Sequence, residues 1–198
     1  MPPSIDPHVP MHAIYWLWVI WYASWLATLL WTSRSVARPS RGAQRANLVT
    51  TGIGILLLFE PPYFGWHSPQ LLQPSDAERW ALLPVIAVAF AFAWWARIEM
   101  GRLWNGYIAR TENHRVIDTG PFALVRHPIY TAIILAALLT GIAQGTLFGI
   151  AGATFIAWGL WLKARLEERF LIGELGKEAY AAYRRRVPML VPFWPKTA

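Results

Sequence analysis

The sequence predicts an all-α integral membrane protein with five transmembrane helices, the last two of which form a C-terminal helical hairpin. Hydrophobic residues make up 56% of the chain and charged residues only 15%, whereas a soluble domain usually carries about a quarter charged residues. The uncharged residues also gather in long runs. The basic residues behind the net charge of +7 lie in segments that flank those runs. This placement fits membrane topology and anionic lipid heads, so no nucleic-acid partner is expected.

Residues 1–99 are expected to contain three transmembrane helices, which the apolar runs at about 11–31, 46–59 and 80–95 predict. Tryptophan prefers membrane interfaces, so the tryptophans near the middle of the first run should face other helices. The loop between the first two runs contains basic residues and no acidic residue, which places it in the cytoplasm. Its basic residues are Arg34, Arg38, Arg41 and Arg45.

Glu60 is the strongest candidate for a charged residue at membrane depth in this half of the chain. Such a residue is a candidate functional acid. Two prolines follow it and end the second helix, so we interpret Glu60 as a structural residue near the outer interface. The loop that follows, residues 67–79, carries Asp76 and Glu78 against Arg79, which suits the outer side of the membrane.

Residues 100–198 are expected to hold a cytoplasmic loop, two transmembrane helices and a C-terminal helix. The membrane helices are predicted at about 128–141 and 146–162, near the lower limit of about 17 residues for a crossing. No Asp, Glu, Lys or Arg occurs between His127 and Lys163, and the connection between the two runs is short. The two helices should therefore form a hairpin.

The C-terminal helix is predicted at 163–182, because that stretch has no proline and many good helix formers. The three arginines at 184–186 should bind anionic lipid heads. Small residues recur every four positions from Gly145 to Ala157, a spacing that lets helix backbones approach closely. Five crossings place the N-terminus outside and the C-terminus in the cytoplasm, and all basic segments then fall on one side.

The segment that ends at Tyr130 combines polar side chains with the start of an apolar helix. Pro128 suits the first turn of that helix, where its missing N–H costs nothing. Arg126 and His127 would then lie beside the exposed N–H groups of the helix start, which attract anions. One interpretation is a water-facing site for a carboxylate or phosphate. The other is a basic residue that marks the cytoplasmic end of the helix.

The hairpin brings both of its ends to the same face, so Arg126 and His127 are predicted to lie near Glu167 and Glu168. The stretch 114–117 lies in the cytoplasmic loop and can reach the same place. An acidic pair beside a basic pair would bind a zwitterion, or would equally form a salt-bridge cluster that fixes a helix to a loop. Topology alone leaves both interpretations open.

Several motifs in the second half of the chain occur together and in a fixed order. They are Gly120-Pro121-Phe122, Val125-Arg126-His127-Pro128-Ile129-Tyr130, Glu167-Glu168-Arg169-Phe170-Leu171, Gly176, Tyr180, Tyr183, Val187-Pro188 and Pro192. Over roughly residues 100–193 this pattern resembles the isoprenylcysteine carboxyl methyltransferase family, and membrane phospholipid methyltransferases share a related carboxyl-terminal pattern. Two positions depart from it, since Ala132 stands where a glycine is usual and Leu175 where an aromatic residue is frequent.

The resemblance implies a membrane methyltransferase with S-adenosylmethionine as methyl donor, held in a cytoplasmic cofactor-binding region at the end of the last two helices. It implies Arg126, His127 and Glu168 as catalytic residues. The residues that it implies in cofactor binding are His114, Arg115, Val116, Ile117, Gly120, Arg126, His127, Pro128, Tyr130, Glu167 and Glu168. No metal is expected, and the chain has no cysteine to ligate one.

The acceptor is expected to be a lipophilic small molecule or a lipidated substrate that enters from the bilayer. A carboxylate, as in isoprenylcysteine, is one candidate for the accepting group, and a phenol, a thiol or a phospholipid amine are others. The sequence does not predict an oligomeric state.

Two other classes of protein compete with this interpretation. Sterol-type membrane reductases, which use NADPH, resemble the chain in an Arg-His-Pro-x-Tyr motif before a terminal hairpin. They usually carry further histidine and aspartate near the carboxyl end, whereas no histidine follows His127 here. A scaffold or transporter would need polar residues inside the membrane helices, and Glu60 is the only strong candidate.

Overall fold

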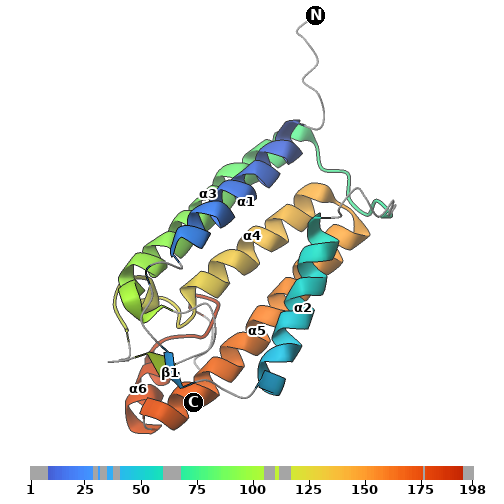
Figure 1. Cartoon of the computed structure of the whole chain (residues 1–198). Coiled ribbons are helices and arrows are strands. Elements are labelled where there is room, and N and C mark those ends of the chain that lie inside the picture. Colours follow the sequence, from blue (N-terminus) through green and yellow to red (C-terminus); the bar gives the residue numbers. More distant parts are fainter. Residues whose placement is uncertain are drawn as a thin grey trace, which may run out of the picture.

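The structure is a computed structural model that describes residues 9–28, 31, 35–37, 41–59, 68–104, 110–111, 117–175 and 177–193. Helices make up most of it, as Figure 1 shows. The α-helices are α1 (Val9–Ala27), α2 (Arg41–Phe59), α3 (Asp76–Met100), α4 (Pro128–Gln144), α5 (Leu147–Leu175) and α6 (Lys177–Arg186). The predicted helical fold is thereby confirmed. Glu60 lies outside the described residues.

A small sheet and two short helices occupy the connections. The strands β1 (Ser35–Ala37) and β2 (Arg110–Thr111) pair antiparallel, with Ser35 opposite Thr111. This short pairing joins two loops at the same end of the molecule and leaves the fold all-α. The 3-10 helix η3 (Gly101–Leu103) follows α3, and η4 (Gly120–Ala123) precedes α4.

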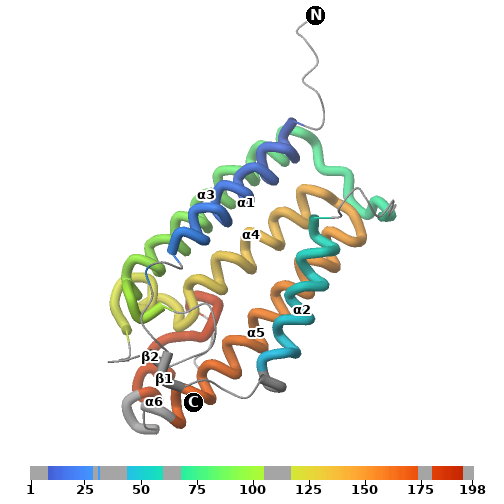
Figure 2. Tube along the Cα trace, in the orientation of Figure 1, coloured from blue at the N-terminus to red at the C-terminus, as the bar shows by residue number. Residues whose placement is uncertain are grey.

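The five long helices alternate in direction. In Figures 1 and 2, α1, α3 and α5 run towards the end of the molecule that holds α6, and α2 and α4 run away from it. Among the described residues, two helices are long and apolar enough to span a bilayer, Asp76–Leu103 and Leu147–Gly173. Two shorter apolar helices are Gln44–Phe59 and Pro128–Gln144. Five crossings and a cytoplasmic face for the α6 end stay predictions.

The helix α5 is longer than the sequence indicated. The apolar run ends at Leu162, where a separate C-terminal helix was expected to begin, but α5 continues to Leu175. The stretch beyond Leu162 lacks proline and is rich in residues of high helix propensity, so nothing in it ends the helix. Glu167 and Glu168 therefore lie on the same rigid helix as the apolar span.

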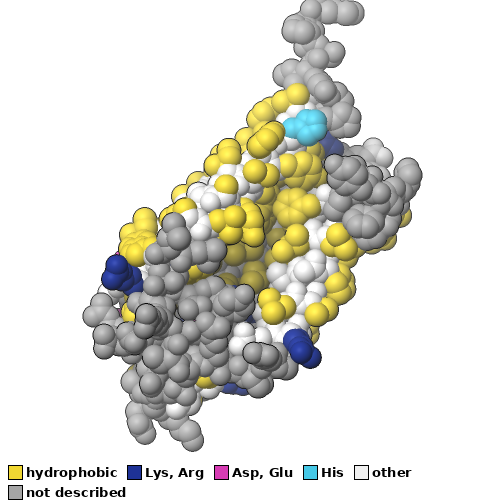
Figure 3. All heavy atoms as spheres, in the orientation of Figure 1, with side chains coloured by type: hydrophobic (Ala, Val, Ile, Leu, Met, Phe, Trp, Pro, Cys, Tyr) yellow, Lys and Arg dark blue, Asp and Glu magenta, His cyan; other side chains and the backbone are white. Residues whose placement is uncertain are grey.

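Trp18 and Trp21 in the middle of α1 face α4 and α3, as expected, whereas Trp16 is 65% exposed. The Trp21 ring stacks on Phe90 of α3, with ring centroids 4.7 Å apart. The indole of Trp18 donates a hydrogen bond to Thr140 of α4 at 2.9 Å. Hydrophobic side chains also cover the face on which α4 lies between α1 and α2 (Figure 3). Because α3 packs on α4, contacts cross the expected division at residue 100, and the division itself stays a prediction.

Small residues let the hairpin helices approach closely. A Cβ atom on Gly141 of α4 would lie 2.7 Å from the carbonyl oxygen of Gly149 in α5. Gly145 ends α4 with a φ of 70°, a left-handed conformation that a residue with a side chain rarely adopts. The expected close approach is confirmed at Gly149 and Ala153, which both lie against Gly141.

A close approach of α2 to α5 yields a paired test. A Cβ atom on Gly54 would lie 2.7 Å from the backbone nitrogen of Ile156, whereas one on Gly52, two residues earlier in α2, would meet no atom within 4 Å. We expect Gly54→Ala to cost about 1–3 kcal/mol of unfolding free energy, because overpacking forces the helices apart. The matched Gly52→Ala should be neutral or slightly stabilising, since alanine favours helix. Thermal unfolding in detergent measures both, and equal effects would contradict this packing.

Candidate active site

The candidate site lies where the α4–α5 hairpin meets the C-terminal segment. Arg126 and His127 directly precede α4, and Tyr130 lies in its first turn. Glu167 and Glu168 project from the last part of α5. The hairpin brings these two groups together, as the sequence predicted.

Arg126 is buried and holds three parts of the chain together. Its Nε donates a hydrogen bond to Oε1 of Glu168 at 2.6 Å. Its Nη1 donates to the backbone carbonyls of Arg184 and Val187. A guanidinium carries several donors in a fixed planar arrangement, and here they reach α5 and the end of α6 at once.

Residues 187–190, which we call the C-terminal strap, cover the start of α4. The backbone N–H of Arg126 donates to the carbonyl of Pro188 at 2.9 Å, and that of His127 donates to Met189 at 3.1 Å. The Thr131 hydroxyl donates to the carbonyl of Leu190 at 2.6 Å. Carbonyls of the strap therefore accept from the N–H groups just before α4, and Arg126 and His127 are buried rather than facing water.

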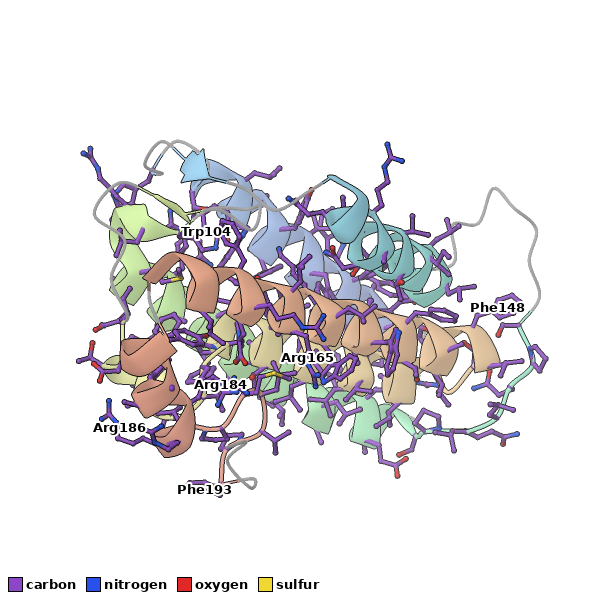
Figure 4. The ribbon with its side chains drawn as sticks, turned by 90° about the horizontal axis from the view of Figure 1, so that it is seen from below. Trp104, Phe148, Arg165, Arg184, Arg186 and Phe193 are labelled. Atoms are coloured by element: carbon purple, nitrogen blue, oxygen red, sulfur yellow. The ribbon has the colours of Figure 1, made fainter. Side chains whose placement is uncertain are left out.

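Tyr183 of α6 fixes the strap from the other side. Its hydroxyl donates to the carbonyl of Phe122 at 2.7 Å. Burial raises the pKa of the Tyr183 phenol, so it stays protonated and able to donate at neutral pH. Arg186 forms an exposed ion pair with Asp118 at 2.9 Å and extends outward from α6 (Figure 4).

Glu168 is the buried carboxylate of the site, with 4% of its surface exposed. Besides Arg126, it faces Nε2 of His127 at 3.3 Å. Its other oxygen lies 3.5 Å from Nε of Arg184. Cationic or hydrogen-bonding groups thus surround this carboxylate, which is the condition under which a charge can be buried.

Glu167 is the more exposed carboxylate, with 26% of its side chain accessible. Its Oε2 accepts a hydrogen bond from the Tyr130 hydroxyl at 2.8 Å and lies 3.8 Å from Nδ1 of His127. The rings of His127 and Tyr130 stack almost in parallel, with centroids 5.3 Å apart. Nζ of Lys163 lies 5.2 Å from the centre of the Tyr130 ring. This part of the site therefore offers an acid, two aromatic faces and a cation.

The other residues that the sequence predicted for cofactor binding lie near the start of α4 or outside the described residues. Pro128 is buried at the start of α4. Gly120 has a φ of 55° and lies against the side chain of Glu99. Ile117 packs on a cluster that includes Trp104 and Phe122. His114, Arg115 and Val116 lie outside the described residues.

Sequence reasoning missed Lys163 and Thr131 as members of the site. In the sequence, Lys163 marks only the end of an apolar run. It lies one helical turn before Glu167, so both side chains project from the same face of α5. Thr131 carries no signal of its own, because its partner is a backbone carbonyl of the strap.

Comparison with known proteins confirms the resemblance. Residues 81–173 match the model of the isoprenylcysteine carboxyl methyltransferase family. The match begins before residue 100, so it includes most of α3, where the sequence motifs had given no indication.

Three curated relatives are similar to this chain: one is named as a metal-resistance protein and two are named as methyltransferases. The cobalt-zinc-cadmium resistance protein CzcN of Cupriavidus metallidurans is 33% identical over 130 residues, which cover 64% of this chain and 51% of that protein. The protein-S-isoprenylcysteine O-methyltransferase of Schizosaccharomyces pombe is 27% identical over 103 residues, which cover 50% and 43%. Methanethiol S-methyltransferase 2 of Bradyrhizobium diazoefficiens is 42% identical over 73 residues, which cover 36% and 26%. The chain thus spans about half or less of each relative, and these comparisons give no support to the reductase alternative.

The buried ion pair predicts that removing one partner lowers the free energy of unfolding strongly, and that removing the other partner as well restores much of it. Arg126→Met should cost about 3–5 kcal/mol, because it leaves Glu168 buried without its main partner. A second substitution, Glu168→Leu, should restore much of this loss by removing the unpaired charge. The exposed pair supplies the control, since Arg186→Ala should cost less than about 1 kcal/mol. Thermal unfolding in detergent measures all four proteins.

Hydrogen exchange supplies a second measurement for the same variants. The backbone amides at positions 126 and 127 donate to the strap, so they should exchange faster in Arg126→Met than in the wild type. Unchanged exchange together with wild-type stability would show that Arg126 does not hold the strap.

Proposed function

From the place of residues 81–173 in the isoprenylcysteine carboxyl methyltransferase family, we propose that the protein is an S-adenosylmethionine-dependent membrane methyltransferase that acts on a lipophilic acceptor. One observation carries this proposal: Glu167, Tyr130 and His127 converge where the apolar helices α4 and α5 meet at the same end, inside the matched region. Two relatives are named as methyltransferases, one of isoprenylcysteine and one of methanethiol.

The chemistry of the partly exposed side chains Glu167 and Tyr130 fits this cofactor. S-adenosylmethionine carries an ammonium, a carboxylate, a ribose diol and a sulfonium. The accessible carboxylate of Glu167 would accept from the ammonium or from the ribose hydroxyls. The partly exposed ring of Tyr130, which stacks on the buried His127, presents an aromatic face that would attract a cation such as the sulfonium.

Arg126 and Glu168 contribute in a different way. Both are buried, and their polar atoms face protein partners at 2.6–3.5 Å. We therefore assign them a positioning role: they fix His127 and the strap, and they orient α5 so that Glu167 faces Tyr130. Residues in direct contact with the reactants would be His127, Tyr130 and Glu167.

The bound cofactor supplies an electrophilic methyl group on a sulfonium. The acceptor attacks the methyl carbon in line with the breaking carbon–sulfur bond, so alignment and proximity account for much of the acceleration. A carboxylate acceptor is already ionised at pH 7 and needs no base. For a thiol or amine acceptor, His127 is the candidate general base, and Glu167 would hold the imidazolium that forms.

The proposal predicts saturable binding of S-adenosylmethionine that depends on Glu167. Glu167→Gln should weaken binding ~10-fold or more, because it removes one charge-assisted hydrogen bond while the volume is kept. Its melting temperature should stay near that of the wild type, since the carboxylate is partly exposed. Equilibrium binding of radiolabelled cofactor to the purified protein in detergent measures this effect.

Two controls accompany this measurement. Glu99→Gln changes an exposed carboxylate that accepts from Thr119 and should leave cofactor binding intact. Glu168→Gln should lower the melting temperature as well as the affinity, because its partners are buried. Absence of saturable binding by the wild-type protein, with no methyl transfer to any acceptor in a lipophilic panel, would refute the function.

A further inference from the structure

An exposed stripe of side chains runs along one face of α5. Phe155 and Trp158 belong to it in the apolar part of the helix, and Arg165 and Arg169 continue it beyond that part. These positions recur at the spacing of helical turns, so their side chains share one face. The segment Leu147–Gly173 is apolar and long enough to cross a bilayer. The stripe is therefore a surface that lipid would meet.

Two tryptophans lie where the stripe changes from apolar to basic. The rings of Trp158 and Trp161 stack, with centroids 4.8 Å apart and an angle of 26° between their planes. The guanidinium carbon of Arg165 lies 5.1 Å from the centre of the Trp161 ring (Figure 4). Tryptophan prefers the interface between the hydrocarbon core and the head groups of a membrane. The stripe thus joins an aromatic surface to a guanidinium at the depth of lipid head groups.

The charges of Arg165 and Arg169 are not neutralised within the part of the chain that the structure describes. Neither guanidinium forms an ion pair there, and the nearby acids Glu167 and Glu168 face other groups. Like charges four residues apart on a helix repel each other. An anion between them would offset this repulsion. Phosphate suits the place, because a guanidinium binds it through two parallel N–H donors.

We propose that this face of α5 is a binding site for one anionic phospholipid. The lipid phosphate would lie between Arg165 and Arg169, and an acyl chain would lie along Trp158 and Phe155. The site is separate from the candidate active site, because Glu167 points to the other side of α5, about 200° away from both arginines. A bound lipid would fix the depth and rotation of the helix that carries Glu167.

The arginines of α6 are the other basic group at this end of the molecule. Nε of Arg184 lies 3.5 Å from Oε2 of Glu168, and Arg186 forms an ion pair with Asp118 at 2.9 Å. Carboxylates of the protein therefore already face two of these three arginines. The two exposed arginines of α5 have no such partner among the described residues, and they also adjoin an apolar surface for the lipid tail.

The test compares an anionic with a zwitterionic lipid of the same acyl chains. Phosphatidylglycerol or phosphatidylcholine is titrated against the protein in detergent, and native mass spectrometry measures the binding of the first lipid. An arginine near the membrane surface strengthens the binding of an anionic lipid about fivefold, so two should give about 30-fold. The wild type should therefore prefer phosphatidylglycerol at least ~10-fold. The double variant Arg165→Gln, Arg169→Gln should reduce this preference to about twofold or less.

Two further variants separate a built site from general basicity. Trp161→Leu keeps every charge but removes the ring on which Arg165 packs, so it should lower the preference about threefold. Arg102→Gln is the matched control. Arg102 is exposed and follows α3 at the same end of the molecule, as Figure 1 shows. This variant loses the same charge as Arg165→Gln and should keep the preference within about twofold of the wild type.

Three results would overturn the site on α5. Equal affinity of the wild type for the two lipids would show that it has no preference for an anionic head. An equal loss in Arg102→Gln and Arg165→Gln would show that only the overall charge matters. Loss of the preference in Arg186→Gln alone would place the lipid at α6. These measurements need no methyl donor, so their outcome is independent of the proposed methyltransferase function.

Discussion

The buried pair of Arg126 and Glu168 is the interaction on which the rest of the site depends. A buried charge without a partner is strongly destabilising, so Arg126 and Glu168 each require the other and further hydrogen bonds. Arg126 finds them in the carbonyls of Arg184 and Val187, and Glu168 finds them in His127. The start of α4, the end of α5 and the C-terminal strap are held together as a consequence.

The arrangement of the helices follows from features that a sequence displays. The absence of Asp, Glu, Lys and Arg between His127 and Lys163, with a short connection inside that stretch, is sufficient to predict the hairpin and the meeting of its two ends. The strap is different, because its contacts with α4 are made by the backbone carbonyls of Pro188 and Met189. Every residue has a carbonyl, so no side-chain pattern indicates which ones will meet the start of a helix.

Arg97 shows the same limit of sequence reasoning. Because Arg97 follows the apolar run 80–95, the sequence alone would indicate only the end of a membrane helix there. The structure buries it between the rings of Trp31 and Trp104, 4.7 and 4.6 Å from their centres, where it donates to the carbonyls of Thr28, Trp31 and Gly101. These carbonyls belong to the ends of α1 and α3, where unpaired acceptors favour a cation. The role of Arg97 depends on α1 and α3 ending next to each other, and the sequence of neither helix reveals this.

The two interpretations of the acidic and basic pairs, a zwitterion site and a salt-bridge cluster, are compatible because α5 is a helix. Successive residues on a helix point about 100° apart, so Glu167 and Glu168 meet different groups, apart from His127, which lies near both. Glu168 turns towards Arg126 and is saturated by protein groups, whereas Glu167 turns towards Tyr130 and stays accessible. The saturated carboxylate fixes the rotation of α5, and that rotation keeps the accessible one available beside the aromatic rings. The buried ion pair of Glu168 thus explains why Glu167 stays partly accessible.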